Sequence, residues 1–156
     1  MSLLIFVGLF VGAESAIAQS NDLHGIAGFS VQVSVADLLS PESGLAGYAE
    51  RALTNAVEIK LQKNGLRLLE KYKRTTKLIV QVSILSRAGQ ESTPVIVKAF
   101  VLEPSTIERT GKKTMAETWN RTFCGVVRMS RIDDGLRIKV DELTDELVNE
   151  WLKANQ

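Results

Sequence analysis

Few side chains in this 156-residue chain could carry out nucleophilic, acid–base or metal chemistry. The chain holds one cysteine, Cys124, and one histidine, His24. A cysteine nucleophile needs a base beside it, and His24 lies far ahead of Cys124, in a glycine-flanked stretch. A zinc site needs three or four ligands at one point. We therefore predict no catalytic residue, no metal site and no cofactor, and interpret His24 as solvated and Cys124 as a buried or partly buried thiol.

The carboxylates offer one further route to catalysis. Asp133 and Asp134 are adjacent at the start of an expected helix, so they point in different directions and are interpreted as partners of the helix dipole. A hydrolase would need carboxylates from separate elements, such as Glu103 and Glu117, to converge in a cleft. Neither a nucleophile elbow, a glycine-rich phosphate loop nor a zinc-protease motif occurs in the sequence. A hydrolase is thus the third alternative, and we do not expect an enzyme.

A basic cluster precedes one of the expected strands: Lys71, Lys73, Arg74 and Lys77. Such a cluster could contact an anionic partner such as a phospholipid head group. It would form one patch with Lys112 and Lys113 if the two loops lie at the same end of the sheet. The alternative interpretation is a solvated loop.

A second candidate contact surface lies on an expected strand over 114–124. Strict alternation would place five residues on one face: Met115, Glu117, Trp119, Arg121 and Phe123. The other face is small and mostly polar, and meets either solvent or a helix. Trp119, flanked by Glu117 and Arg121, is the candidate for an exposed partner contact.

The N-terminus has the pattern of an export signal. Residues 3–13 are eleven apolar or glycine residues in a row, and Ala16 and Ala18 form a small-x-small cleavage site before Gln19. As a helix the run spans about 17 Å, against about 30 Å of hydrocarbon, so it is too short to cross a membrane. It departs from the usual pattern because no lysine or arginine precedes it, and the alternative is a buried core segment. No cysteine follows the cleavage site, which excludes lipid attachment there.

Composition narrows the class of protein. Lysine and arginine number 19 against 18 aspartate and glutamate, and aromatic residues make up 6% of the chain. This balance excludes a nucleic-acid-binding surface and a disordered acidic chain. The length fits one domain. We predict a leader at 1–18, a flexible mature N-terminus at 19–28 and a single domain at 29–156.

Hydrophobic periodicity predicts the elements of that domain. Alternating or β-branched runs predict strands at 29–36, 78–85, 94–102 and 114–124, and a brief one at 66–69. Spacing of three and four predicts helices at 45–63 and 131–153, the second with Ser130 and Asp133 as a capping pair. The expected buried stripe of the first helix is rich in alanine and has larger apolar residues beside it: Leu45, Ala49, Ala52, Ala56 and Ile59, flanked by Leu53, Val57 and Leu61. The fold class is α+β: a two-layer sandwich with a largely antiparallel sheet of four to five strands and two helices on one face.

Several segments resemble a group of small exported bacterial proteins of unknown function. They are the alternating strand at 31–35, the helix end at 60–66, the strand at 78–82, the segment at 116–119 and the helical end at 151–155. The resemblance implies an exported bacterial protein, and it implies no activity, cofactor or catalytic residue.

These observations together predict a non-enzymatic periplasmic or secreted interaction domain. It would contact another macromolecule through the sheet face around Trp119 or through a sheet edge. The alternative is a small-ligand or lipid-binding module of the cell envelope that uses the gap between sheet and helices. The expected partner is accordingly an envelope protein or a lipid, with no nucleic acid and no transmembrane span in the mature form.

Overall fold

The computed structural model describes residues 23–39, 45–71, 74–87 and 89–156. A short 3-10 helix, Met129–Arg131, leads into the last of the main elements. These elements are, in order, β1 (Gly28–Asp37), α1 (Leu45–Lys63), β2 (Arg67–Leu68), β3 (Lys77–Ile84), β4 (Ser92–Ile107), β5 (Lys112–Arg128) and α2 (Ile132–Ala154). The predicted leader at 1–18 lies outside the described residues.

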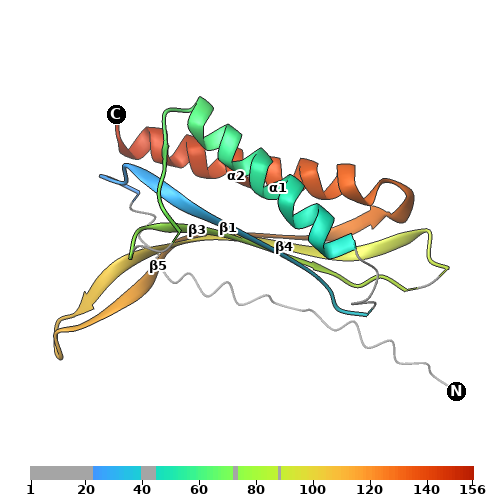
Figure 1. The fold of residues 1–156 in the computed structure, drawn as a ribbon, viewed down its shortest axis with the longest axis horizontal. Coiled ribbons are helices and arrows are strands. Elements are labelled where there is room, and N and C mark those ends of the chain that lie inside the picture. Colours follow the sequence, from blue (N-terminus) through green and yellow to red (C-terminus); the bar gives the residue numbers. More distant parts are fainter. Residues whose placement is uncertain (1–22, 40–44, 72–73, 88) are drawn as a thin grey trace, which may run out of the picture.

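The strands form one sheet in the order β2-β1-β3-β4-β5, and both helices lie on the same face of it (Figure 1). The predicted two-layer α+β class is therefore confirmed. The sheet is mixed rather than largely antiparallel, because β1 runs parallel to both β2 and β3. The cause is α1, which carries the chain back along the sheet so that β3 begins at the same end as β1.

Helix α1 has the predicted bounds but buries a different stripe. Leu53, Val57 and Leu61 are almost fully buried, whereas Ala52 is exposed and Ile59 is 51% exposed. The larger side chains turn inward because they remove more apolar area from water than alanine does. The helix ends ahead of Gly65, whose φ of +84° is left-handed, the conformation that favours glycine after a helix.

Helix α2 follows its predicted stripe but not its predicted cap. The buried positions include Ile132, Leu136, Val140, Leu143 and Leu147. The Ser130 and Asp133 capping pair does not form, because Arg131 occupies the N-cap position without a side-chain bond. The 3-10 turn ahead of the helix moves its start past Ser130.

A lysine joins the two helices. The Lys60 ammonium on α1 lies 2.8 Å from Asp141 and 2.7 Å from Asp145, one turn apart on α2. Burial lowers the pKa of Lys60, but the two carboxylates outweigh burial, so the pKa is raised above 10.5. The charged lysine therefore holds α1 against α2.

The segment ahead of β1 is packed, which corrects the prediction of a flexible N-terminus at 19–28 for its described part. Leu23 is fully buried and Ile26 nearly so. The Trp151 indole N–H donates to the Ile26 carbonyl at 2.7 Å, and the Asn155 amide donates to the Leu23 carbonyl at 3.0 Å. The end of α2 thus holds this segment, through contacts that local sequence patterns do not reveal.

Strands β4 and β5 continue past the rest of the sheet as a two-stranded arm, Glu103–Ile107 with 112–116, which projects beyond β3 (Figure 1). The predicted strand end at 102 is wrong, since β4 runs through Pro104. The backbone nitrogen of Pro104 points toward the side of β4 on which β3 lies. No residue of β3 lies opposite it, because β3 begins at Lys77, opposite Leu102. Proline therefore costs no ladder bond there.

Candidate functional site

A bulge at Thr118 divides the side chains of β5 between two faces. Val101 pairs with Trp119, but the next residue of β4, Leu102, pairs with Glu117, so Thr118 is an extra residue. Trp119 consequently faces the helices, together with Val101. Glu117 faces the open side of the sheet. The predicted common face for Glu117, Trp119 and Arg121 is therefore wrong.

Trp119 is a core residue with 0% exposure. Its indole N–H donates to Glu150 of α2 at 2.9 Å, and Arg121 donates to the other oxygen of the same carboxylate at 2.5 Å. The Arg121 Nε also lies 3.4 Å from Glu146. Trp119 and Arg121 thus attach α2 to β5. The prediction of an exposed partner contact at Trp119 is wrong, because the bulge turns its side chain inward.

The two carboxylates considered for a hydrolase lie on opposite faces. Glu117 lies on the open face, 3.5 Å from Lys98, and accepts a bond from the Asn120 amide at 2.6 Å. Glu103 accepts a bond from the Thr118 hydroxyl at 2.6 Å on the helix side. They do not converge in a cleft, so this pair cannot act as acid and base on one substrate.

The structure distributes the basic cluster over two hollows, and Lys73 lies outside the described residues. Lys71 and Lys77 line a groove beside the edge of β1, with Glu50 and Thr54 of α1 on its other side. Arg74 lines a hollow along the arm together with Lys113. The two basic loops therefore do lie at the same end of the sheet.

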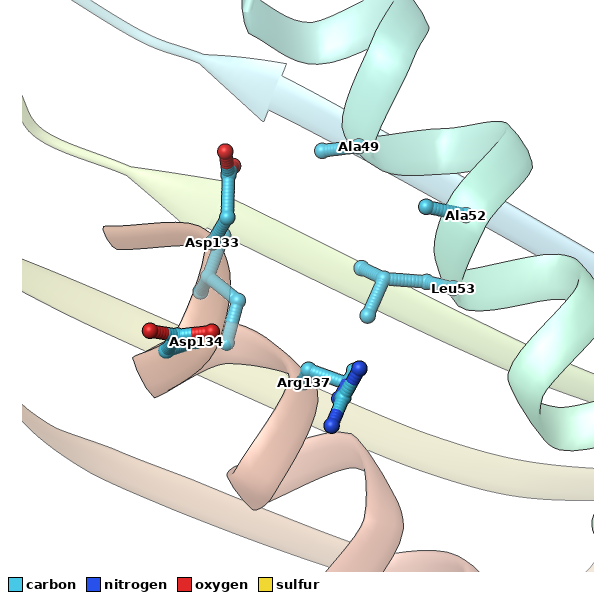
Figure 2. Close-up of a pocket in the computed structure, with 7 residues that line it drawn as sticks. Ala49, Ala52, Leu53, Asp133, Asp134 and Arg137 are labelled. Atoms are coloured by element: carbon cyan, nitrogen blue, oxygen red, sulfur yellow. The ribbon is translucent and has the colours of Figure 1, made fainter. Parts of the chain in front are cut away.

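A hollow between the helices is lined by Ala49, Ala52 and Leu53 of α1 and by Asp133, Asp134, Leu136 and Arg137 of α2 (Figure 2). The two aspartates point in different directions, as predicted from their adjacent positions. Both lie in the first turn of α2 and are exposed. Among the described residues no group of three or more His, Cys, Asp and Glu side chains could hold a metal ion. The hollow has the residues of a helix start rather than of a catalytic centre.

The outer edge of β5 is the feature best suited to contact a partner. The Met129 N–H donates to the Glu91 carbonyl at 2.9 Å, one pair beyond the last rung of the β4–β5 ladder. Because antiparallel hydrogen bonding alternates, odd-numbered residues after the bulge bond to β4. The backbone N–H and C=O groups of Thr122, Cys124 and Val126 then point away from the sheet. Within the described sheet no strand lies beyond them.

Apolar side chains surround this edge. The run Thr122–Val127 carries no charge and lies between Arg121 and Arg128. Val126 on the open face is 66% exposed, and Ile138 on α2, which shares a hollow with Val127, is 55% exposed. Cys124 is exposed, which corrects the prediction of a buried or partly buried thiol. Natural edge strands usually carry charge or proline. The uncharged run is therefore the sequence signal for this site, and it was missed because periodicity alone does not predict which strand lies at an edge.

No protein-family model and no curated protein matches this chain. Three solved structures share distant similarity. A PelC dodecamer from Paraburkholderia phytofirmans has 17% identity over 80% of this chain and 86% of its own, with a TM-score of 0.39. A minor lipoprotein from Acinetobacter baumannii has 15% identity over 80% and 91%, with a TM-score of 0.33. Lipoprotein GNA1162 from Neisseria meningitidis has 16% identity over 78% and 95%, with a TM-score of 0.26.

Proposed function

We propose that this protein is a non-enzymatic interaction domain of the cell envelope or the extracellular space, which binds a protein chain along the outer edge of β5. The supporting observation is the run Thr122–Val127, where outward-pointing backbone groups combine with uncharged side chains on an edge strand. Strand addition gives affinity through main-chain hydrogen bonds and specificity through alternate side chains. Here Val126 and Cys124 would contact the partner on the open face.

Export is part of the proposal. The apolar run at 3–13 and the cleavage site at Ala18 support a removed leader. In the described part of the chain, no helix is long and apolar enough to cross a membrane. Mass spectrometry of the mature N-terminus tests this point. A product that begins at Gln19 is expected, and a product that retains Met1 would contradict it.

Site-specific photo-crosslinking in producing cells tests the interaction. Benzoylphenylalanine in place of Val126 should capture a protein chain, because that side chain borders the free edge. The matched control is the same substitution at Ile59, which is also about half exposed but lies on α1. Capture from 126 and not from 59 supports the proposal. No captured chain from 126 contradicts it.

A second candidate function is binding of an anionic lipid at the basic end of the sheet. It is favoured by one observation: Arg74 and Lys113 line the same hollow along the arm. Sedimentation with phosphatidylglycerol vesicles tests it against neutral phosphatidylcholine vesicles. The double variant Arg74→Glu/Lys113→Glu should lose binding to the anionic vesicles, and Arg87→Glu, past the other end of β3, should keep it. Equal binding to both vesicle types excludes this function.

A further inference from the structure

The outer edge of β5 is complementary to itself. A second copy related by a two-fold axis perpendicular to the sheet keeps its helices on the same side, so opposing residues must share a face. Successive residues of a strand alternate faces, so the axis must pass through a residue rather than between two. The outward-pointing residues Thr122, Cys124 and Val126 can then exchange main-chain bonds with the same residues of the second copy.

An axis at Cys124 gives the best match of side chains. It places Phe123 opposite Gly125 of the second copy, so that the largest side chain of the run meets the smallest. Phe123 already lies over Gly125 within its own strand, where a Cβ atom would meet the ring. Thr122 then lies opposite Val126 of the second copy. An axis one residue further along would instead oppose the two glycines and bring together the two Phe123 rings that lie over them.

Charge is compatible with the axis at Cys124. Arg121 lies opposite Val127 of the second copy in this register, and Arg128 lies opposite Asn120. Like charges that lie directly opposite each other destabilise a strand pair. This register opposes no two like charges. The pairing also brings a second copy beside Val126 and Ile138, the two most exposed apolar side chains near this edge.

The other edge of the sheet is less accessible to a strand. Around Ser30–Val33 the edge of β1 borders a groove whose walls include Glu50 on α1 and the lysines at positions 71 and 77. Lysines at an edge are a common protection against strand addition. Pairing of β5 with β1 of a further copy, which would give an open chain or a ring, is therefore disfavoured relative to a closed pair.

We propose that the partner at this edge is a second copy of this chain, joined by antiparallel pairing of β5 with β5 about a two-fold axis at Cys124, so that two sheets become one. This inference rests on the proposed function and names its partner. The single cysteine of the sequence provides a built-in probe, since Cα atoms of a hydrogen-bonded pair lie about 5.5 Å apart.

Light scattering and spin labelling of the protein purified from producing cells test the inference. A dilution series should show a dimer that dissociates on dilution. A nitroxide on Cys124 should show strong dipolar broadening, which excess unlabelled protein removes. Thr122→Pro should yield a monomer, because it removes an outward N–H without removing a bond to β4. Ile59→Glu should remain a dimer, and a single cooperative urea transition checks that each variant is folded.

If Thr122→Pro does not fold, Val126→Lys provides the same test, because it adds a charge at the same edge without changing the backbone. A protein that is monomeric at every concentration, a dimer that survives both edge variants, or a ring or filament would overturn the inference. Photo-crosslinking from position 126 separates this result from the proposed function. Capture of a different protein, without self-capture, would uphold strand addition and refute the second copy. No capture at all would refute both.

Discussion

Replacing Trp119 with phenylalanine tests the inward orientation that the bulge produces. The variant removes the indole N–H that donates to Glu150 and leaves a smaller ring in a fully buried position. A lost hydrogen bond to a charged acceptor costs about 1.5–3 kcal/mol. The lower end applies here, because the Glu150 side chain is 27% exposed and keeps Arg121 as a partner. The cavity adds about 1–2 kcal/mol, so we expect the free energy of unfolding to fall by about 3 kcal/mol.

Equilibrium urea unfolding, followed by far-ultraviolet circular dichroism, measures this loss. With an m-value of about 1.5 kcal/mol/M, the midpoint should fall by about 2 M while the slope stays unchanged. Trp151→Phe is the matched comparison, because Trp151 is half-buried and donates to a neutral carbonyl. It should cost about 1 kcal/mol. A loss below about 0.5 kcal/mol for Trp119→Phe, the range of surface substitutions, would show that Trp119 lies on an exposed face and refute the inward orientation.

Four further variants test the packing around the sheet. Lys60→Met should lower the free energy of unfolding by about 1 kcal/mol at neutral pH. The pKa of Lys60 in the folded protein is raised above its ordinary value. The difference in urea midpoint between the variant and the natural protein should therefore disappear as the pH rises through the folded pKa. Asn155→Ala should lower the free energy of unfolding by about 1–2 kcal/mol. It should also speed amide hydrogen exchange in the segment ahead of β1, which hydrogen–deuterium exchange mass spectrometry measures. Gly28→Ala should be strongly destabilising in thermal unfolding, since its Cβ would overlap the Arg67 carbonyl oxygen. Deletion of Thr118 should lower the free energy of unfolding by only about 1 kcal/mol, because the pairs on both sides of the bulge keep their register. A red shift in the fluorescence of Trp119, which would report its exposure to water, would contradict this.

Periodicity was sufficient to predict the elements that pack by one regular face. Helix α1 has the predicted bounds, and α2 buries the predicted stripe, because each helix has a repeat that continues for several turns. The two-layer arrangement follows from those faces. The parallel pairing of β1 with β3 depends on how α1 crosses the sheet, which neither strand sequence encodes alone.

Irregular and long-range features account for the errors. The alternation of β5 predicts one face for Glu117 and Trp119, and a single extra residue at Thr118 invalidates it. The bonds of Trp151 and Asn155 to the segment ahead of β1 join opposite ends of the chain. Sequence patterns over a few residues predict neither the bulge nor the bonds between the two ends of the chain. The two basic loops lie at one end of the sheet, the arrangement that a single basic patch requires.

The bulge at Thr118 determines both the core and the proposed interface. Before it, in the arm, the odd-numbered residues of β5 have their side chains on the open face and their backbone groups at the outer edge. After it, the even-numbered residues take both roles. The extra residue therefore allows Trp119 to face α2, and Cys124 and Val126 to lie at the outer edge, while Glu117 faces the open side. The inward turn of Trp119 and Arg121 also joins β5 to α2 through Glu150. An edge strand fixed in this way is already ordered before a partner arrives, so strand addition has little further backbone ordering to overcome.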